Sequence, residues 1–331
     1  MRRLQKLTSL ALTGGLLLAL LAPSALATPV VPEGMGTLAY GYVEELAAET
    51  RAAGTGQELA AAEQIDTWFD SMGYNAGFQS FTYGPTSKPS YSQNVIAFKK
   101  ATASPAGKTV PLVIVGAHYD CVPAGKGADD NASGVGVMLE VAERLADADL
   151  PYDIAFIAFG AEEVGLEGSN YYVKQMSKAD RERAIAMINF DSLIVGDYRY
   201  IHAAFNHKTW VRDEMLGIID DYDLGIRTHT SPRYPAGITP PGFSDYTAFS
   251  KAGIAVAAFE STNWEIGDLD GYLQLDAATE FAGTDYDDLW EIWHTEFDYL
   301  KFIDWLLGDR PEDHLEAYST LVYVFLRDLE P

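Results

Sequence analysis

The chain has 331 residues, 48% of them hydrophobic, and a formal net charge of −25, which suffices for one large globular domain or two small ones. The large negative charge argues against nucleic acid and anionic membranes as partners, and it favours cationic ligands or metal ions. Cys121 is the single cysteine, so no internal disulfide can form and any metal must be held by histidine and carboxylate groups.

The first 27 residues have the pattern of a secretory signal peptide. A basic start, MRRLQK, precedes an apolar run, and residues 25–27 (Ala-Leu-Ala) match the small-x-small cleavage pattern. The alternative is a membrane anchor, but Gly14 and Pro23 interrupt the run. We therefore predict export, cleavage near Ala27 and a mature chain at −28, because the signal removes three basic and no acidic residues. No later segment is long and apolar enough to span a bilayer, so we expect no stable membrane association.

The N-terminal third of the mature chain predicts helices followed by strands. Residues 38–72 are typical of one or two amphipathic helices, interrupted by a Gly-Thr-Gly step. Residues 77–83 alternate like a strand, and residues 92–100 and 109–116 predict two more. The turn-rich connection between the last two predicts that they pair as an antiparallel hairpin.

Strands and helices alternate from residue 134 onward. Helical periodicity covers residues 134–148, 168–176, 207–222, 300–307 and 314–329. Apolar strand patterns cover residues 152–160, 183–191 and 253–261. This alternation predicts an α/β fold with a mostly parallel central sheet, an antiparallel edge hairpin and helices on both faces. We expect a single domain over residues 28–331.

Acidic residues and a histidine follow several of the apolar strands directly. Four strands run into polar residues in this way, namely into His118 with Asp120, Glu162 with Glu163, Asp191, and Glu260. Ligands of open α/β sheets bind at the carboxyl ends of the strands, where these groups would meet. Carboxylates and imidazole gathered at a dry edge are costly without a cation. The pattern therefore predicts a metal site, although each residue alone also has an ordinary structural explanation.

The adjacent acidic pairs fit a catalytic metal site. Histidine nitrogen and carboxylate oxygen suit zinc. Neighbours in an extended segment point in opposite directions, so one of Glu162 and Glu163 can bind metal while the other acts as a base on the substrate side. Asp129 and Asp130 offer a weaker version of the same arrangement in a loop.

Other catalytic motifs are missing from the sequence. It contains neither HExxH nor G-x-S-x-G. His202, His207, His229 and His314 have no acidic neighbours of the kind that surrounds His118, and they receive no assignment.

Several ordered motifs resemble the M28-type co-catalytic di-zinc aminopeptidases over most of the mature chain. The motifs are SQNVIAF, GAHYD, GADDNASG, FIAFGAEEVGLEGSNYYV, MINFD, SDYTAFSKAGIAV and WHTEFD. The resemblance implies a zinc exopeptidase-like fold and two Zn²⁺ per chain. It also implies hydrolysis of the N-terminal residue from peptides or proteins with a free N-terminus.

The resemblance also implies roles for single residues. The implied metal ligands are His118, Asp130, Glu163, Asp191 and His294, with Asp130 bridging both ions. The two histidines would each bind one ion, and Glu163 and Asp191 would be terminal ligands, one on each. Glu162 would be the general base, and Asp120 would orient His118, as carboxylates beside ligating histidines do. Two such ions can polarise a peptide carbonyl and activate water.

The chain departs from the family pattern beside the last ligand. Many relatives have Tyr before this histidine, where it can help stabilise the oxyanion, whereas here Trp293 offers an indole N–H. The segment STNWEIGDLDGY follows the strand end at Glu260 and contains Asp268 and Asp270, which are candidate substrate-binding residues together with Trp293. With the negative net charge, these acids predict a preference for N-terminal Arg or Lys.

Three alternatives use the same fold. A glutaminyl cyclase would carry a single zinc, and a non-catalytic peptidase-like binding domain would have lost ligands or the base. The complete set of ligand types argues against both. An endopeptidase or carboxypeptidase on a similar scaffold stays open. We expect a monomer that acts on peptide substrates.

Overall fold

A mixed β-sheet forms the centre of residues 31–331, which cluster as one unit. The structure is a computed structural model that describes residues 30–102 and 107–331, so the predicted signal peptide lies outside the described residues. Within this described part, the strand order is β1-β2-β4-β3-β5-β9-β6-β7, with β8 beside β6. The strands are β1 (Gly77–Tyr83), β2 (Ser90–Lys99), β3 (Leu112–His118), β4 (Asp153–Phe159), β5 (Ala184–Phe190), β6 (Tyr198–Ala204), β7 (Ile226–Arg227), β8 (Ile238–Thr239) and β9 (Ala255–Thr262).

The predicted hairpin between residues 92–100 and 109–116 is wrong. Strand β2 pairs antiparallel with both β1 and β4, and β4 separates β2 from β3. Every residue of β3 is buried, and its neighbours β4 and β5 run parallel to it. A strand that is apolar on both faces belongs in the middle of a sheet, whereas β2 mixes exposed and buried positions. The antiparallel hairpin at the sheet edge is therefore β1–β2.

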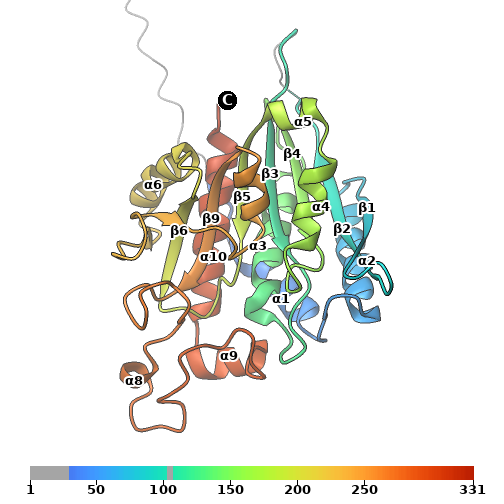
Figure 1. Cartoon of the computed structure of the whole chain (residues 1–331). Helices are drawn as coiled ribbons and strands as arrows, with labels where there is room; N and C mark the ends of the chain where they lie inside the picture. The colour runs from blue at the N-terminus through green and yellow to red at the C-terminus, as the bar shows by residue number, and fades with distance from the viewer. Residues whose placement is uncertain (1–29, 103–106) are drawn as a thin grey trace, which may run out of the picture. The chain divides into compact units, whose positions relative to one another are not determined.

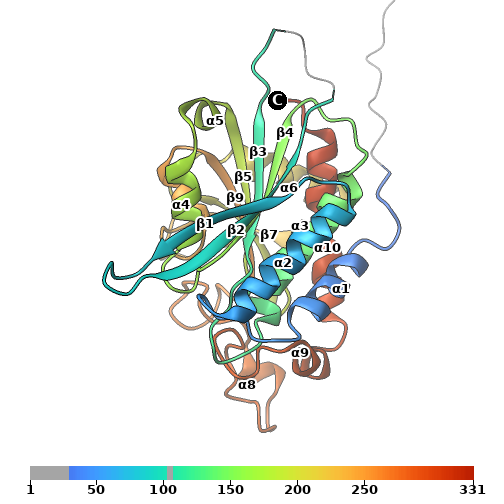
Figure 2. The same ribbon diagram turned by 90° about the vertical axis from the view of Figure 1, so that its right-hand side faces the viewer.

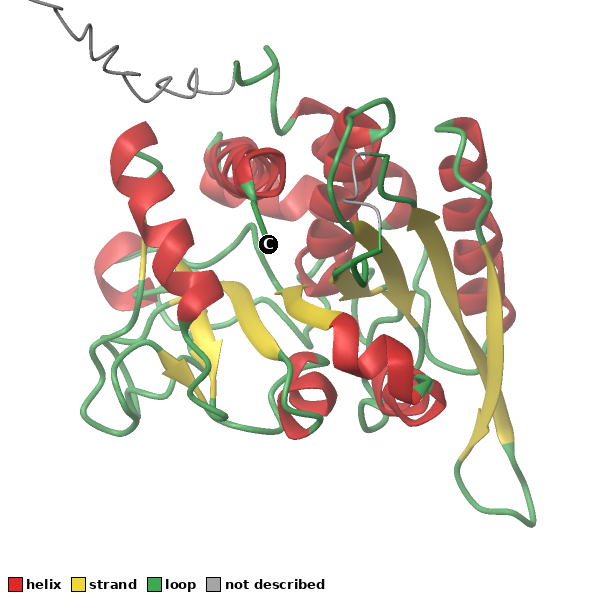
Figure 3. Cartoon of the chain, turned by 90° about the horizontal axis from the view of Figure 1, so that it is seen from above, coloured by secondary structure: helices red, strands yellow, loops and turns green. Residues whose placement is uncertain are grey.

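Helices cover both faces of the sheet (Figures 1, 2 and 3). One face carries α1 (Thr37–Leu46), α2 (Gly56–Ser71), α3 (Gly134–Leu145), α6 (Trp210–Tyr222) and α10 (Arg310–Asp328). The other face carries α4 (Glu167–Gln175) and α7 (Tyr246–Lys251). The remaining α-helices of the described residues are α5 (Lys178–Arg183), α8 (Ala277–Glu280) and α9 (Leu300–Leu307), and a short irregular turn, η1 (Ala128–Ser133), precedes α3. With its parallel strands β4, β3, β5 and β9, this arrangement confirms the predicted fold class.

Alternate side chains of the central strands face the two helical layers. Val113 and Val115 of β3 belong to the core under α1, α3 and α10, whereas Leu112 and Ile114 belong to the core under α4 and α7. This is the period-two alternation of a strand. It explains why β3 contains no polar residue before His118.

The carboxyl ends of the parallel strands position the polar residues noted in the sequence. His118 is the last residue of β3, Asp191 directly follows β5, and Glu162 and Glu163 follow β4. Strands β4, β3 and β5 are neighbours, as Figure 1 shows. These side chains therefore meet at one edge. Glu260 differs, because β9 continues past it to Thr262.

Candidate metal centre

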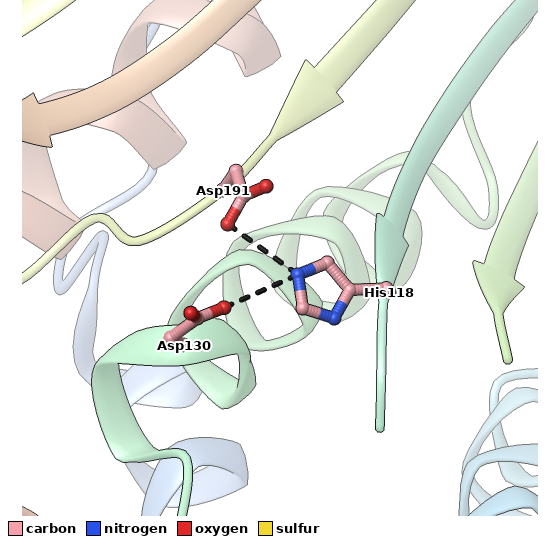
Figure 4. A group of neighbouring side chains, drawn as sticks. All are labelled: His118, Asp130 and Asp191. Atoms are coloured by element: carbon pink, nitrogen blue, oxygen red, sulfur yellow. Dashed lines mark hydrogen bonds and ion pairs between the residues drawn. The ribbon is translucent and has the colours of Figure 1, made fainter. Parts of the chain in front are cut away.

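The first group of candidate ligands joins His118, Asp130 and Asp191 (Figure 4). His118 Nε2 lies 3.2 Å from Asp130 Oδ1 and 3.4 Å from Asp191 Oδ1. The imidazole is almost fully buried, and Asp191 has 19% of its side chain exposed. The imidazole and the two carboxylates therefore face one small space beside the cavity.

The second group joins Asp130, Glu163 and His294. His294 Nε2 lies 3.1 Å from Asp130 Oδ2 and 3.5 Å from Glu163 Oε2. Asp130 therefore presents one carboxylate oxygen to each histidine. A carboxylate placed in this way can bridge two neighbouring cations.

The donor spacing fits divalent metal ions. In each group the candidate donor atoms lie within 4.8 Å of one another. A tetrahedral site with bonds of about 2.05 Å places neighbouring donors about 3.3 Å apart, close to the distances of 3.1–3.5 Å measured from the two histidines. The nitrogen and oxygen donors also match the preference of zinc.

The electrostatics of the two groups favour the binding of a positive charge. The carboxylates of Asp130 and Glu163 accept hydrogen bonds from His294 and raise its pKa to about 11. Burial raises the pKa of Glu163 to about 7, with a further contribution from Asp130. Burial opposes ionisation of Asp130, but the two histidines outweigh it and hold its pKa below the ordinary value. Protons on these groups balance the charge here, and a bound cation would replace them.

Glu162 and Glu163 lie in a tight turn after β4, and not in the extended segment that the sequence analysis assumed. The turn begins at Ala161, which has a φ of 56°, and the Glu162 carbonyl accepts from the N–H of Gly165. Glu163 enters the second ligand group, whereas Glu162 belongs to neither. Burial raises the pKa of Glu162 well above its ordinary value, although the positive charge of His118 opposes the shift.

Asp120 holds both this turn and the first histidine. Its carboxylate accepts from the N–H groups of Glu162 at 2.9 Å and of Glu163 at 3.2 Å. His118 Nδ1 lies 3.2 Å from the Asp120 carbonyl oxygen and 3.7 Å from carboxylate Oδ1. Asp120 thus links β3 to the turn after β4, with its backbone oxygen the nearer partner of the imidazole.

Three residues outside the predicted site hold the loop that carries Asp130. The fully buried Asp129 accepts from the N–H of Ile194 and from Gln274 Nε2, and so points away from the ligand groups. Asp298 accepts from the N–H groups of both Asp129 and Asp130. Gln274 Oε1 also accepts from the N–H of Trp293, one residue before His294. Asp129 and Asp298 stand near the predicted ligands Asp130 and His294 in sequence, whereas Gln274 does not.

A cavity of about 320 Å³ opens beside both ligand groups. Its lining includes all five predicted ligands together with Glu162, Asp270 and Trp293. The indole Nε1 of Trp293 is buried and has no hydrogen-bond partner within the described residues. Asp268 is 86% exposed, does not line the cavity and lies beside Arg233. Asp270 lines the cavity but forms an ion pair with Arg233 at 3.2 Å.

One histidine left unassigned in the sequence has an acidic partner in this cavity. His202 Nε2 lies 3.0 Å from Glu260 Oε1, and both residues line the cavity. The pair joins β6 to β9 across their antiparallel register. A separation of 58 residues hides this contact from any local reading of the sequence.

The profile of Peptidase family M28 matches residues 94–318, about two thirds of the chain. The chain belongs to peptidase family M28. This membership confirms the predicted peptidase class, and a relative named as an aminopeptidase supports the metallo-aminopeptidase prediction. The alkaline phosphatase isozyme conversion protein of Escherichia coli K12 is 34% identical over 305 residues, covering 84% of this chain and 86% of that protein. The aminopeptidase YwaD of Bacillus subtilis is 35% identical over 174 residues, covering 51% of this chain and 35% of that protein.

Solved structures share the fold of this M28 peptidase. The zinc aminopeptidase BSAP from Bacillus subtilis superposes with a TM-score of 0.72 at 19% identity, over 91% of this chain and 97% of that one. A glutaminyl cyclase from Fimbriiglobus ruber superposes with a TM-score of 0.67 at 16% identity, over 91% and 98% of the two chains. Both likenesses concern the fold alone.

Across the described residues, no helix is long and apolar enough to cross a membrane.

Proposed function

We propose that this M28 peptidase is an exported aminopeptidase with two co-catalytic zinc ions, which removes the N-terminal residue from peptides or proteins. The observation that carries the proposal is the pair of ligand groups that share Asp130, one oxygen to each histidine. Glu162 lies in the same cavity outside both groups. A shared carboxylate supports two ions, and an unengaged carboxylate beside them supports a general base.

Five residues would hold the ions. His118 and Asp191 would bind the first, His294 and Glu163 the second, and Asp130 both. Such ions supply Lewis-acid polarisation of the scissile carbonyl and lower the pKa of water. Asp120 would keep His118 in position from the far side of the ring.

Glu162 and Trp293 would act on the substrate itself. Glu162 takes a proton from the attacking water and delivers it to the leaving amine, a transfer that requires its carboxylate to start ionised. The unpartnered indole N–H of Trp293 can donate to the oxygen of the tetrahedral intermediate, as oxyanion-hole donors do.

The second ligand group distinguishes this proposal from a cyclase with one zinc. Two groups of three donors share Asp130, so Glu163 and His294 are additional to the first group of His118, Asp130 and Asp191. A non-catalytic binding domain would have no need for Glu162 in this place. We therefore prefer hydrolysis over cyclisation and over simple binding.

Substrate preference and export extend the proposal. The acidic cavity and the net charge of −25 support a preference for N-terminal Arg or Lys. Cleavage after Ala27 would release a single-domain, monomeric enzyme of residues 28–331. N-terminal sequencing of the exported protein should then begin at Thr28, and a retained Met1 would contradict export by this signal.

The direct test is a panel of aminoacyl p-nitroanilides, together with N-blocked analogues, assayed with and without chelator. We expect hydrolysis of the free aminoacyl substrates, no hydrolysis of the blocked ones, loss with chelator and recovery with zinc. Cleavage of blocked substrates would instead favour an endopeptidase. Cyclisation of N-terminal glutamine without hydrolysis would favour the cyclase.

A further inference from the structure

Glu260 is an acidic residue that lines the cavity, and its carboxylate belongs to neither ligand group. His118 and His294 line the same cavity. Its side chain is 21% exposed, so the carboxylate is accessible from the cavity. This charge is therefore available to bind something other than the ions.

Two neighbours fix one oxygen of Glu260 and leave the other free. Trp264 Nε1 donates to Oε1 at 2.6 Å, and His202 Nε2 lies 3.0 Å from the same oxygen. Stacking of the Trp264 ring on His229, with centroids 4.0 Å apart, holds the indole in place. No described residue forms a hydrogen bond or ion pair with Oε2. The carboxylate is thus held rigidly with one acceptor unused.

The other acids near this part of the cavity are already engaged. Asp270 pairs with Arg233 through Oδ2, and its Oδ1 accepts from the N–H of Tyr272. Asp268 lies outside the cavity lining. Among the described residues that line the cavity there is no Lys or Arg. An incoming cation would therefore find Glu260 as the acid without a Lys or Arg partner.

The rest of the wall suits the stem of a long cationic side chain. Phe243, Tyr272 and Trp293 line the cavity together with Glu260. Aromatic faces bind methylene stems and attract guanidinium or ammonium groups. A carboxylate with a free acceptor adds a charge-assisted hydrogen bond, and guanidinium groups fit carboxylates well.

We infer that Glu260, held by Trp264 and His202, is the specificity-determining residue that binds the cationic side chain of an N-terminal Arg or Lys. This inference rests on the proposed aminopeptidase function, and it assigns to Glu260 the role that the sequence suggested for Asp268 and Asp270. The α-ammonium group of the substrate is a different cation. It must lie next to the scissile carbonyl, where the ligand carboxylates already gather.

The test compares wild type with Glu260→Gln on Arg-, Lys-, Leu- and Ala-p-nitroanilides. Gln keeps an acceptor for Trp264 and His202 but removes the charge. We expect kcat/KM to fall about 10- to 100-fold for Arg and Lys, as for loss of a hydrogen bond to a charged group, and to stay within about 3-fold for Leu and Ala. Glu260→Asp, which keeps the charge one methylene further back, should give an intermediate loss. Asp268→Asn is the matched control, and it should leave the ratio of kcat/KM for Arg to kcat/KM for Leu unchanged.

An equal loss on all four substrates would overturn the inference, because it would place Glu260 at the α-ammonium group or in a purely structural role. A wild type that prefers Leu over Arg would overturn it as well. Calorimetric binding of L-arginine and L-leucine to wild type and to Glu260→Gln tests the cationic pocket without any catalytic turnover. It therefore separates failure of this inference from failure of the proposed function. If no aminoacyl substrate is hydrolysed, the proposed function fails. Weaker arginine binding by Glu260→Gln would still support the cationic pocket, and unchanged arginine binding would refute it.

Discussion

Two adjacent acids, Glu162 and Glu163, take different positions in this site because of a turn. Glu163 forms a candidate ligand group with Asp130 and His294, whereas Glu162 lines the cavity and belongs to neither group. The turn at Ala161 directs the two side chains differently. Asp120 fixes this turn, because its carboxylate accepts from the N–H groups of both residues. At the scale of the residue, this asymmetry separates the proposed metal ligand from the proposed general base.

Replacement of the base tests this separation. Glu162→Gln keeps the shape of the side chain but cannot accept a proton, so we expect kcat to fall about 100-fold or more. Metal content should stay near that of wild type, because Glu162 lies in neither ligand group. Glu163→Gln is the matched comparison and should lose metal. Normal turnover by Glu162→Gln would exclude it as the base.

At the scale of the element, two connections assemble the site. The loop before α3 brings Asp130, and the segment before α9 brings His294. Asp298 and Gln274 tie the two together, since Asp298 accepts from the loop N–H groups and Gln274 bonds both to Asp129 and to the N–H of Trp293. The carboxylate of Asp130 is therefore placed by residues that belong to neither ligand group.

Asp298→Asn tests this support. An amide offers one acceptor oxygen where the carboxylate accepts two N–H groups, so the loop that carries Asp130 should loosen. We expect metal affinity to fall about 10- to 100-fold, as when partners that orient ligands are removed, while the fold is retained. Chelator titration of residual activity measures the change, with Asp268→Asn as control. Equal chelator sensitivity in both variants would show that Asp298 does not support the site.

The elements that the sequence predicted are those with a strong local period. Residues 300–307 and 77–83 form α9 and β1 with the predicted bounds. The hairpin prediction failed because nearness along the chain favoured β2–β3, whereas burial placed β4 between them. Strand β6 was missed because Arg199 and His202 interrupt its apolar pattern.

The candidate site shows the same limit. Strand ends and motifs indicated the residues that now form the two ligand groups. The side-chain partners of Asp129 lie 65 and 145 residues away in the chain, and His202 lies 58 residues from Glu260, so no local pattern reveals these contacts. Contacts between residues so far apart in the chain can be identified only from the folded structure.

At the scale of the whole molecule, a buried histidine couples stability to pH. Burial lowers the pKa of His314 from its ordinary value of 6.5 to about 3, with further lowering by Arg199 and Arg310. Below pH 6.5, His314 binds a proton in the unfolded chain but stays neutral in the folded chain until the pH approaches 3. Stability is therefore lost progressively as the pH falls from about 6.5 toward 3.

Replacing His314 should weaken this dependence. We expect the free energy of unfolding of His314→Gln to fall less between pH 7 and pH 4 than that of wild type, even though its value at pH 7 is lower, because contacts to Leu193 and Ser261 are lost. Urea unfolding at several pH values provides the measurement. The exposed His207→Asn should keep the wild-type slope. An unchanged slope in His314→Gln would exclude this coupling.

The central claim is that this M28 peptidase works with two metal ions bridged by Asp130. The most direct measurement is the number of zinc ions per chain in fully active enzyme, determined by elemental analysis after dialysis. We predict close to two ions in wild type and loss of both in Asp130→Ala, with His118→Ala and His294→Ala each weakening mainly one. A single tightly bound ion in a fully active enzyme would contradict the claim.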